Sequence, residues 1–119
     1  MDAITLKMKN IENILINKEV DGNFPNHPAD PLRQENQEYL RQRVLETKAD
    51  VGLAFDGDAD RVFLLDEKGE SISGSLTTAL IADQILAERP DESVIYNLIC
   101  SKVVPEVILE RGGIGIRSR

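Results

Sequence analysis

The chain has 119 residues, of which 41% are hydrophobic and only 4% aromatic, and it contains no tryptophan. This length allows one small domain or a part of a larger protein, with a modest core of aliphatic side chains. The formal net charge of −7 disfavours nucleic acids and anionic membranes as partners, because both would repel the surface.

The sequence has none of the features of a secreted or membrane-spanning protein. A single cysteine cannot form an internal disulfide, and no apolar run approaches the ~18 residues that span a membrane. The N-terminus lacks the basic-then-apolar pattern of a signal peptide. We therefore expect a soluble, cytoplasmic protein.

Residues 1–19 combine two conflicting patterns, since the first apolar residues alternate as in a strand and the later ones have helical spacing. The alternating set is Ile4, Leu6 and Met8, and the helical set is Ile11, Ile14 and Leu15. Residues 21–31 are rich in Gly, Asn, Asp and Pro and are predicted to form a loop. His27 lies within it and is expected to be a hydrogen-bonded loop residue rather than a ligand or base.

Residues 34–48 are predicted to form a helix that starts after Pro31. Leu40, Val44 and Leu45 give this helix an apolar face, and its other positions are polar or charged. Its role is therefore packing, with surface ion pairs that each contribute little.

Two short apolar segments, residues 51–55 and 62–65, have the character of buried strands. A polar turn at 66–69 follows the second segment, and its Gly69 suits a positive φ angle. The loop at 56–61 is therefore predicted to join an antiparallel pair of strands.

The C-terminal part begins with a polar crossing at 71–74, which we interpret as a domain junction. Ser75 can cap a helix at 76–88 that Pro90 closes off. Residues 94–98 follow as a buried strand.

A second helix is predicted from Ser101, which offers a cap, to the glycines at 112–113, and it tolerates Pro105 in its first turn. Residues 114–116 start another strand, and Cys100 is expected to be a small buried hydrophobic residue. The elements predict an α/β fold class: a mixed sheet with flanking helices and an incomplete α/β sandwich unit at the C-terminal end.

Residues 56–61 read Asp-Gly-Asp-Ala-Asp-Arg, with three carboxylates at alternate positions. The small spacers let the chain curl until Asp56, Asp58 and Asp60 converge. Ligands that are all oxygen indicate Mg²⁺, Ca²⁺ or Mn²⁺ rather than zinc or copper. Our preferred interpretation is a Mg²⁺ site completed by a phosphate oxygen, with Arg61 neutralising charge on the same phosphate.

Two other interpretations of this loop are an acidic solvated turn and a calcium loop of the EF-hand type. The turn is disfavoured because it crowds like charges. The EF-hand spacing puts Glu67 at the twelfth position, but Arg61 stands where that loop needs glycine. The flanking segments also have the character of strands, where an EF-hand needs helices.

The same six residues resemble the metal-binding loop of the α-D-phosphohexomutases, the phosphomannomutase and phosphoglucomutase family. Residues 21–28, Asp-Gly-Asn-Phe-Pro-Asn-His-Pro, resemble a second signature of that family, upstream of the first. The resemblance runs from about residue 20 to about residue 113, and residues 1–9 match nothing in the family.

Family enzymes are four-domain chains several times longer than this one. The chain resembles the end of their second domain, at 1–70, joined to the start of their third, at 71–119. The resemblance implies a reversible phosphoryl transfer between the 1- and 6-positions of a hexose phosphate, through a bisphosphorylated sugar and with a phosphoserine as donor.

Carried to this sequence, the resemblance implies that Asp56, Asp58 and Asp60 bind Mg²⁺ and that Arg61 is catalytic, near the transferring phosphoryl group. The family's serine motif, Ser-His-Asn-Pro, has no counterpart here. The sugar-selecting loop and the phosphate-clamping domain would lie beyond Arg119. We therefore expect hexose phosphate to bind only together with the remaining mutase domains, and no activity of the chain alone.

Two alternatives remain open. One is a non-catalytic acidic metal-binding module that acts with a partner chain supplying the phosphate. The other is an aspartate-nucleophile phosphatase, which is disfavoured because Arg61 stands where that chemistry needs a threonine- or valine-type residue. Ile99 occupies a position that is basic in some relatives, so the choice between mannose and glucose phosphates stays open.

Overall fold

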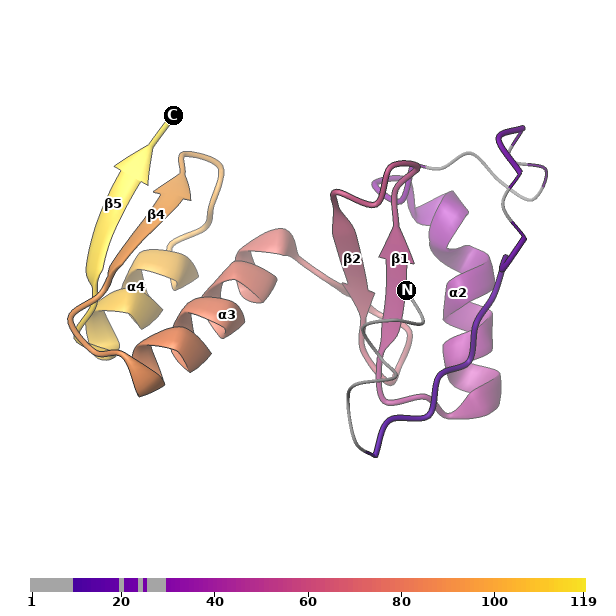
Figure 1. Cartoon of the computed structure of the whole chain (residues 1–119), viewed down its shortest axis with the longest axis horizontal. Coiled ribbons are helices and arrows are strands. Elements are labelled where there is room, and N and C mark those ends of the chain that lie inside the picture. Colours follow the sequence, from indigo (N-terminus) through magenta and orange to yellow (C-terminus); the bar gives the residue numbers. More distant parts are fainter. Residues whose placement is uncertain (1–9, 20, 24, 26–29) are drawn as a thin grey trace.

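The computed structural model describes residues 10–19, 21–23, 25 and 30–119. Its helices and strands are arranged in two lobes that a short segment connects (Figure 1). None of the helices in the described ranges combines the length and apolar character needed to cross a membrane.

The N-terminal predictions are tested only in part. The alternating residues Ile4, Leu6 and Met8, and also His27, lie outside the described residues. Residues 10–19 form neither helix nor strand, so the helical spacing there does not produce a helix. In the expected loop, the main-chain N–H of Asn23 donates to Asp21 Oδ1 at 2.9 Å, a short-range bond typical of turns.

The first lobe contains one helix and a three-stranded antiparallel sheet. Helix α2 spans Gln34–Thr47, and strands β1, β2 and β3 span Gly52–Phe55, Val62–Leu65 and Ser71–Ile72. The strand order is β1-β2-β3, and each neighbouring pair is antiparallel. The predicted helix and strand pair are therefore confirmed, with ends that differ by at most one residue.

Helix α2 packs closely on β1 because the facing position has no side chain. A Cβ built on Gly52 would lie 2.8 Å from Val44 Cγ2 and 3.3 Å from Leu65 Cβ. Val44 and Leu65 are both only 2% exposed, so they form the centre of this small core. The helix ends at Thr47, and the capping residue Lys48 adopts a left-handed conformation.

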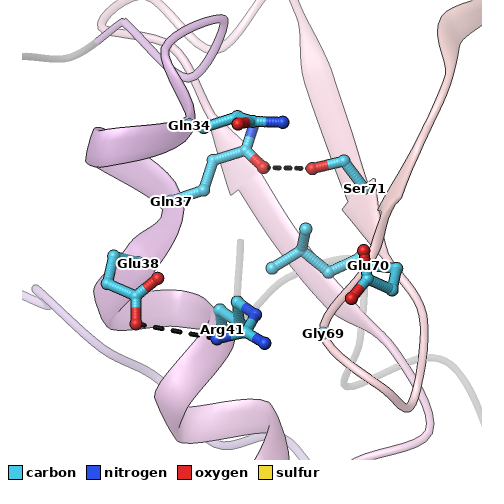
Figure 2. Close-up of a pocket in the computed structure, with 8 residues that line it drawn as sticks. Gln34, Gln37, Glu38, Arg41, Gly69, Glu70 and Ser71 are labelled. Carbon is cyan, nitrogen blue, oxygen red and sulfur yellow. Dashed lines mark hydrogen bonds and ion pairs between the residues drawn. The ribbon is translucent and has the colours of Figure 1, made fainter.

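A polar pocket of about 280 Å³ separates the start of α2 from the β2–β3 turn (Figure 2). Across it, Ser71 Oγ donates to Gln37 Oε1 at 2.6 Å, while Gln37 Nε2 donates to the carbonyl of Pro31. Gln37 is buried, and both polar atoms of its side chain have partners. The glutamine therefore ties the short strand β3 to α2.

The second lobe contains two helices and a pair of parallel strands. In chain order these are α3 (Gly74–Glu88), β4 (Ser93–Asn97), α4 (Val103–Glu110) and β5 (Ile114–Ser118). Strands β4 and β5 pair in parallel, and α4 makes the crossover between them.

The core of this lobe lies between the two helices and one face of the sheet. Its buried members are Ala79, Ala82, Leu86, Val104 and Ile108. Val94 and Tyr96 of β4 pack against them, as does half-buried Cys100. The Sγ of Cys100 donates to Asn97 Oδ1 at 3.3 Å, so this residue combines core packing with a weak hydrogen bond.

The predicted α/β class is confirmed, and its antiparallel and parallel strands lie in two separate sheets. The positive φ angle predicted at Gly69 is present, at 75°. The helix stop predicted at 112–113 is also present, because α4 ends at Glu110 and Gly112 has a φ of 76°.

Both serine caps were predicted wrongly. Ser73 caps α3, accepting a hydrogen bond from the N–H of Leu76 at 3.2 Å. Ser75 Oγ instead accepts from the N–H of Ser101 at 2.9 Å, linking the start of α3 to the β4–α4 loop. Helix α4 starts after Lys102 without a side-chain cap.

The crossing expected at 71–74 also differs from the structure. Ser71 and Ile72 pair with β2 as a third strand, so the chain leaves the first sheet only at Ser73. Pairing with β2 satisfies backbone groups that a free crossing would leave to solvent.

Candidate metal centre

The loop between β1 and β2 is closed tightly at its base. Phe55 and Val62 form the last pair of the strand ladder. Inside it, the N–H of Asp56 donates to the carbonyl of Arg61 at 3.3 Å, and the N–H of Ala59 donates to the carbonyl of Asp56 at 3.1 Å. Ala59 has a φ of 58°, which lets the chain reverse within six residues.

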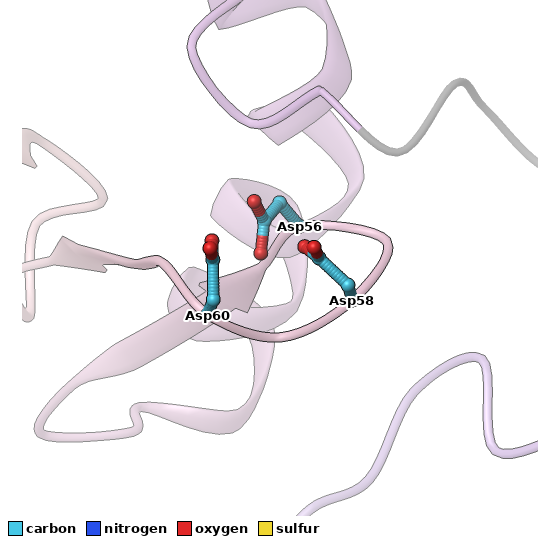
Figure 3. Close-up of side chains that lie close together, drawn as sticks. All are labelled: Asp56, Asp58 and Asp60. Carbon is cyan, nitrogen blue, oxygen red and sulfur yellow. The ribbon is translucent and has the colours of Figure 1, made fainter.

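Figure 3 shows the carboxylates of Asp56, Asp58 and Asp60 gathered on this loop. One oxygen of each lies within 4.8 Å of the others. Asp56 is buried, whereas Asp58 and Asp60 are exposed, so the cluster is anchored in the protein and open to solvent on one side. The structure therefore brings together the three aspartates that the sequence singles out, and their role as metal ligands stays a prediction.

Arg61 lies against the buried member of the cluster. Its main-chain N–H donates to Asp56 Oδ1 at 3.1 Å, and its Nε donates to Asp56 Oδ2 at 2.6 Å. Asp60 Oδ1 lies 3.3 Å from the same Nε. One arginine thus offsets part of the charge of two carboxylates.

The pKa of Asp56 lies below its usual value. Burial opposes ionisation of this carboxyl, but the hydrogen bonds and the positive charge of Arg61 outweigh burial and lower the pKa. Asp56 is therefore ionised at neutral pH, as a metal ligand must be. The same hydrogen bonds and charge raise the pKa of the Arg61 guanidinium.

The donor set fits a hard divalent cation. Carboxylate oxygens are ligands that Mg²⁺ and Ca²⁺ prefer, and the cluster contains no nitrogen or sulfur donor. Mg²⁺ holds its ligands at about 2.1 Å in an octahedron, so oxygens on neighbouring corners lie about 3 Å apart. The three carboxylate oxygens lie within 4.8 Å of one another, so binding of the ion would draw them closer together.

A hollow of about 310 Å³ lies beside Arg61, between β2 and the first turn of α3. Phe63, Ile72 and Thr77 are among the residues that line it. Because the Arg61 side chain is 60% exposed, its guanidinium can meet a solute that enters from this side.

The fold and this loop define a class of protein: an α/β protein with a three-carboxylate cluster that can hold a metal ion. Comparison with known proteins specifies the family. Residues 2–69 match the family described as "Phosphoglucomutase/phosphomannomutase, alpha/beta/alpha domain II". The chain belongs to the phosphoglucomutase/phosphomannomutase family.

Relatives in this family are similar over most of the chain. It is 42% identical over 123 aligned residues to a phosphomannomutase of Methanocaldococcus jannaschii. This alignment covers 98% of the chain and 27% of that protein. It is 42% identical over 95 residues to a phosphomannomutase/phosphoglucomutase of Pseudomonas putida, covering 80% of the chain and 20% of that protein. The chain thus spans about a quarter of the length of the curated relatives it matches.

A solved structure supports the same conclusion. A phosphoglucomutase/phosphomannomutase family protein from Burkholderia thailandensis superposes with a TM-score of 0.81 at 33% identity, over 85% of this chain and 22% of the other. The expectation that residues 1–9 match nothing in the family was wrong, since the family match starts at residue 2. Short strand-like segments without distinctive residues carry too little information to be recognised from one sequence.

The sequence indicates that Arg61 partly relieves the repulsion among the three carboxylates and favours a phosphate, but it does not reveal the direct contact with Asp56. The tight loop returns Arg61 to the start of β2, directly opposite Asp56. The predicted strands before and after the loop could have revealed this contact. When they pair in antiparallel register, the two ends of the loop must lie side by side.

Proposed function

We propose that the chain is a segment of a phosphohexomutase, most like the phosphomannomutases, and that it supplies the magnesium-binding loop. The observation that carries this proposal is the convergence of three carboxylates in a family member whose relatives are named phosphomannomutase and phosphoglucomutase. The reaction of the complete enzyme would interconvert hexose 1-phosphate and hexose 6-phosphate.

In this proposal Asp56, Asp58 and Asp60 hold Mg²⁺. The bound cation would supply positive charge that steadies the phosphate of the donor serine. Asp56 is suited to the fixed position because it is buried and already ionised, whereas Asp58 and Asp60 can adjust from the exposed side.

Arg61 is proposed as the catalytic residue of this segment. Within the described residues its carboxylate contacts use Nε, so the two terminal nitrogens of the guanidinium can donate to a phosphate. Positive charge at this point offsets charge on the oxygens of the transferring phosphoryl group and lowers the barrier. Contacts with two aspartates hold the arginine in place before substrate arrives, which limits the entropy lost on binding.

The remaining catalytic groups must come from the remaining mutase domains. The sequence contains no Ser-His-Asn-Pro motif, so the phosphoserine would belong to those domains. We propose that residues 1–70 and 71–119 are two partial domains, and that hexose phosphate binds only when the rest of the enzyme is present.

The test is metal binding by calorimetry. Titrate Mg²⁺ into the chain with and without a phosphoserine peptide, and repeat with Asp58→Asn and with Glu67→Gln, which removes one exposed charge outside the cluster. Wild type and Glu67→Gln should bind Mg²⁺ more tightly with the peptide present, and Asp58→Asn should lose roughly tenfold or more in affinity. Equal affinities for all three chains would mean that residues 56–60 form only an acidic turn.

A further inference from the structure

The chain contains two Asp-Gly dipeptides, and the structure places them in opposite surroundings. Asp21-Gly22 lies in the N-terminal loop, and Asp56-Gly57 starts the loop of the candidate metal centre. Asp-Gly is prone to rearrange, because glycine has no side chain to shield its main-chain nitrogen from the preceding carboxyl group. The nitrogen can attack the carboxyl carbon and close a five-membered succinimide ring. The freedom and exposure of each dipeptide therefore decide whether it reacts.

Nothing in the described structure crowds Asp21-Gly22. Both residues and the following Asn23 are exposed. A Cβ built on Gly22 would meet nothing within 4 Å, so no neighbouring side chain limits the movement of this peptide unit. Water and the main-chain nitrogen of Gly22 can therefore both reach the carboxyl group of Asp21.

The hydrogen bonds of Asp21 favour attack on its carboxyl carbon. Asp21 Oδ1 accepts from the main-chain N–H of Asn23 and from Asn23 Nδ2, both at 2.9 Å. Two donors on one oxygen stabilise the negative charge that this oxygen gains when Cγ is attacked. Both bonds from described residues are on Oδ1, which leaves Oδ2 able to take up protons and depart as water.

Asp56-Gly57 is the same dipeptide with a fixed carboxyl group. The Asp56 side chain is only 2% exposed, and both of its oxygens accept hydrogen bonds from Arg61. Arg61 therefore holds the carboxylate across the closed base of the loop, and Cγ cannot turn toward the nitrogen of Gly57 without breaking both bonds. Burial also keeps out the water that would open a succinimide ring.

We propose that Asp21-Gly22 is a site of spontaneous isomerisation to isoaspartate, and that Arg61 protects Asp56-Gly57 from the same reaction. The Gly22 nitrogen forms a bond to Asp21 Cγ and loses its proton, while the Cγ–Oδ2 bond breaks and Oδ2 leaves as water. Water then adds to the main-chain carbonyl carbon of Asp21, and the bond from this carbon to the Gly22 nitrogen breaks. Overall no atom is gained or lost, and no oxidant or cofactor is needed.

Isoaspartate changes the loop in two ways. It adds a methylene group to the main chain, and it leaves the former main-chain carboxyl as a free side group. The contacts between Asp21 Oδ1 and Asn23 depend on the original spacing and would be lost. The free carboxylate is the group that isoaspartyl methyltransferases modify, so repair enzymes of this class are the expected partner. The reaction is independent of metal binding and of mutase activity.

The test is incubation of the folded chain at neutral pH and physiological temperature. An isoaspartyl methyltransferase with labelled S-adenosylmethionine then marks the product, and mass spectrometry of peptides locates it. Isoaspartate should accumulate at residue 21 roughly tenfold faster or more than at residue 56, because residue 56 reacts only while its loop is open. In denaturant the two rates should agree within about threefold, since both dipeptides are then exposed.

Three variants test the assigned causes. Gly22→Ala places a methyl group in open space, where it shields the nitrogen without a clash, and should slow the reaction at residue 21 roughly tenfold. Asn23→Ala removes one donor to Oδ1 and should slow it about two- to tenfold. Arg61→Gln should let isoaspartate appear at residue 56 and leave the rate at residue 21 unchanged, whereas the control Glu67→Gln should change neither.

Three results would overturn the isomerisation site: no isoaspartate at residue 21 of the folded chain, equal rates at residues 21 and 56 of the folded chain, or an unchanged rate in Gly22→Ala. Circular dichroism shows that each variant is folded during the incubation. If residue 56 stays intact in folded Arg61→Gln, the protective role assigned to the arginine is wrong.

Discussion

At the scale of single residues, the candidate metal centre depends on how one arginine is shared. Arg61 neutralises the buried carboxylate of Asp56, whose side chain is only 2% exposed, while most of the arginine itself stays in solvent. The burial of an unpaired carboxylate would be costly, so the pair stabilises the loop before any cation binds. A Mg²⁺ ion would then enter a site with two remaining negative charges, which balance its own charge.

Ala59 is strained at the centre of this loop. Its φ of 58° lies in the left-handed region, which costs an L-residue other than glycine roughly 1 kcal/mol. We expect Ala59→Gly to raise the free energy of unfolding by up to about 1 kcal/mol, measured by urea denaturation. Ala87→Gly, at an exposed position inside α3, is the control and should lower it by about 1 kcal/mol. If both variants are destabilised alike, the strain assigned to Ala59 is absent.

At the scale of elements, each lobe contains one contact between elements whose contribution to stability can be measured. In the first lobe, α2 can approach β1 only because position 52 lacks a side chain. Gly52→Ala places a methyl group 2.8 Å from Val44 Cγ2, so the helix or the buried valine must shift. We expect a loss of about 1–3 kcal/mol in unfolding free energy, as for other overpacked cores.

The control for this variant is Gly74→Ala at the start of α3. A Cβ there meets nothing within 4 Å, and its φ is not positive, so the stability should stay the same or rise slightly. Thermal unfolding of both variants makes the comparison, and a Gly52→Ala chain as stable as wild type would rule out the tight packing of α2 on β1.

In the second lobe, Asp83 of α3 pairs with Arg111 at the end of α4. Arg111 Nε and one terminal nitrogen donate to the two carboxylate oxygens at 2.5 and 3.1 Å. The hydrogen bond from Arg111 is the main cause of a lowered pKa at Asp83; partial burial opposes it and the charge of Arg111 adds to it. A bidentate contact of this kind fixes how the two helices cross.

The lowered pKa determines how stability changes with pH. The carboxyl of Asp83 binds protons less readily in the folded chain, so its stabilising effect is fully present above the unfolded pKa of about 3.9 and is lost as pH falls through the lower folded value. We expect Asp83→Asn to be less stable than wild type at pH 7 and to approach wild type below about pH 4. Urea denaturation at pH 7 and below about pH 4 measures the difference in unfolding free energy between Asp83→Asn and wild type. Glu88→Gln is the control on the same helix. A difference that stays constant down to pH 3 would show that the ion pair does not contribute.

At the scale of the whole molecule, the chain supplies only one part of the catalytic apparatus we propose. It spans about a quarter of its curated relatives and has no serine motif. We expect the chain alone to show no mutase turnover with mannose 1-phosphate or glucose 1-phosphate, even with the bisphosphate activator and Mg²⁺. A coupled assay for the 6-phosphate measures it, and turnover that disappears in Asp58→Asn would contradict the absence of a nucleophile.

The sequence by itself determined most of the elements, the loop and the family. Helix α2 and strands β1 and β2 were predicted within one residue because each has its own periodicity and its own stop signals. The aspartate cluster was predictable because alternate carboxylates between two strands have few ways to point apart. These features all depend on residues that are close together in the chain.

Only the tertiary structure decided the features that depend on residues distant in the chain. Strand β3 exists because β2 offers an edge and Gln37 of α2 holds Ser71, a contact between residues 34 positions apart. Ser75 does not cap α3 as predicted, because its Oγ accepts a hydrogen bond from the N–H of Ser101 in the β4–α4 loop. Local patterns set which structures a segment can form, but the choice between them depends on free energies of contact that no short stretch of sequence contains.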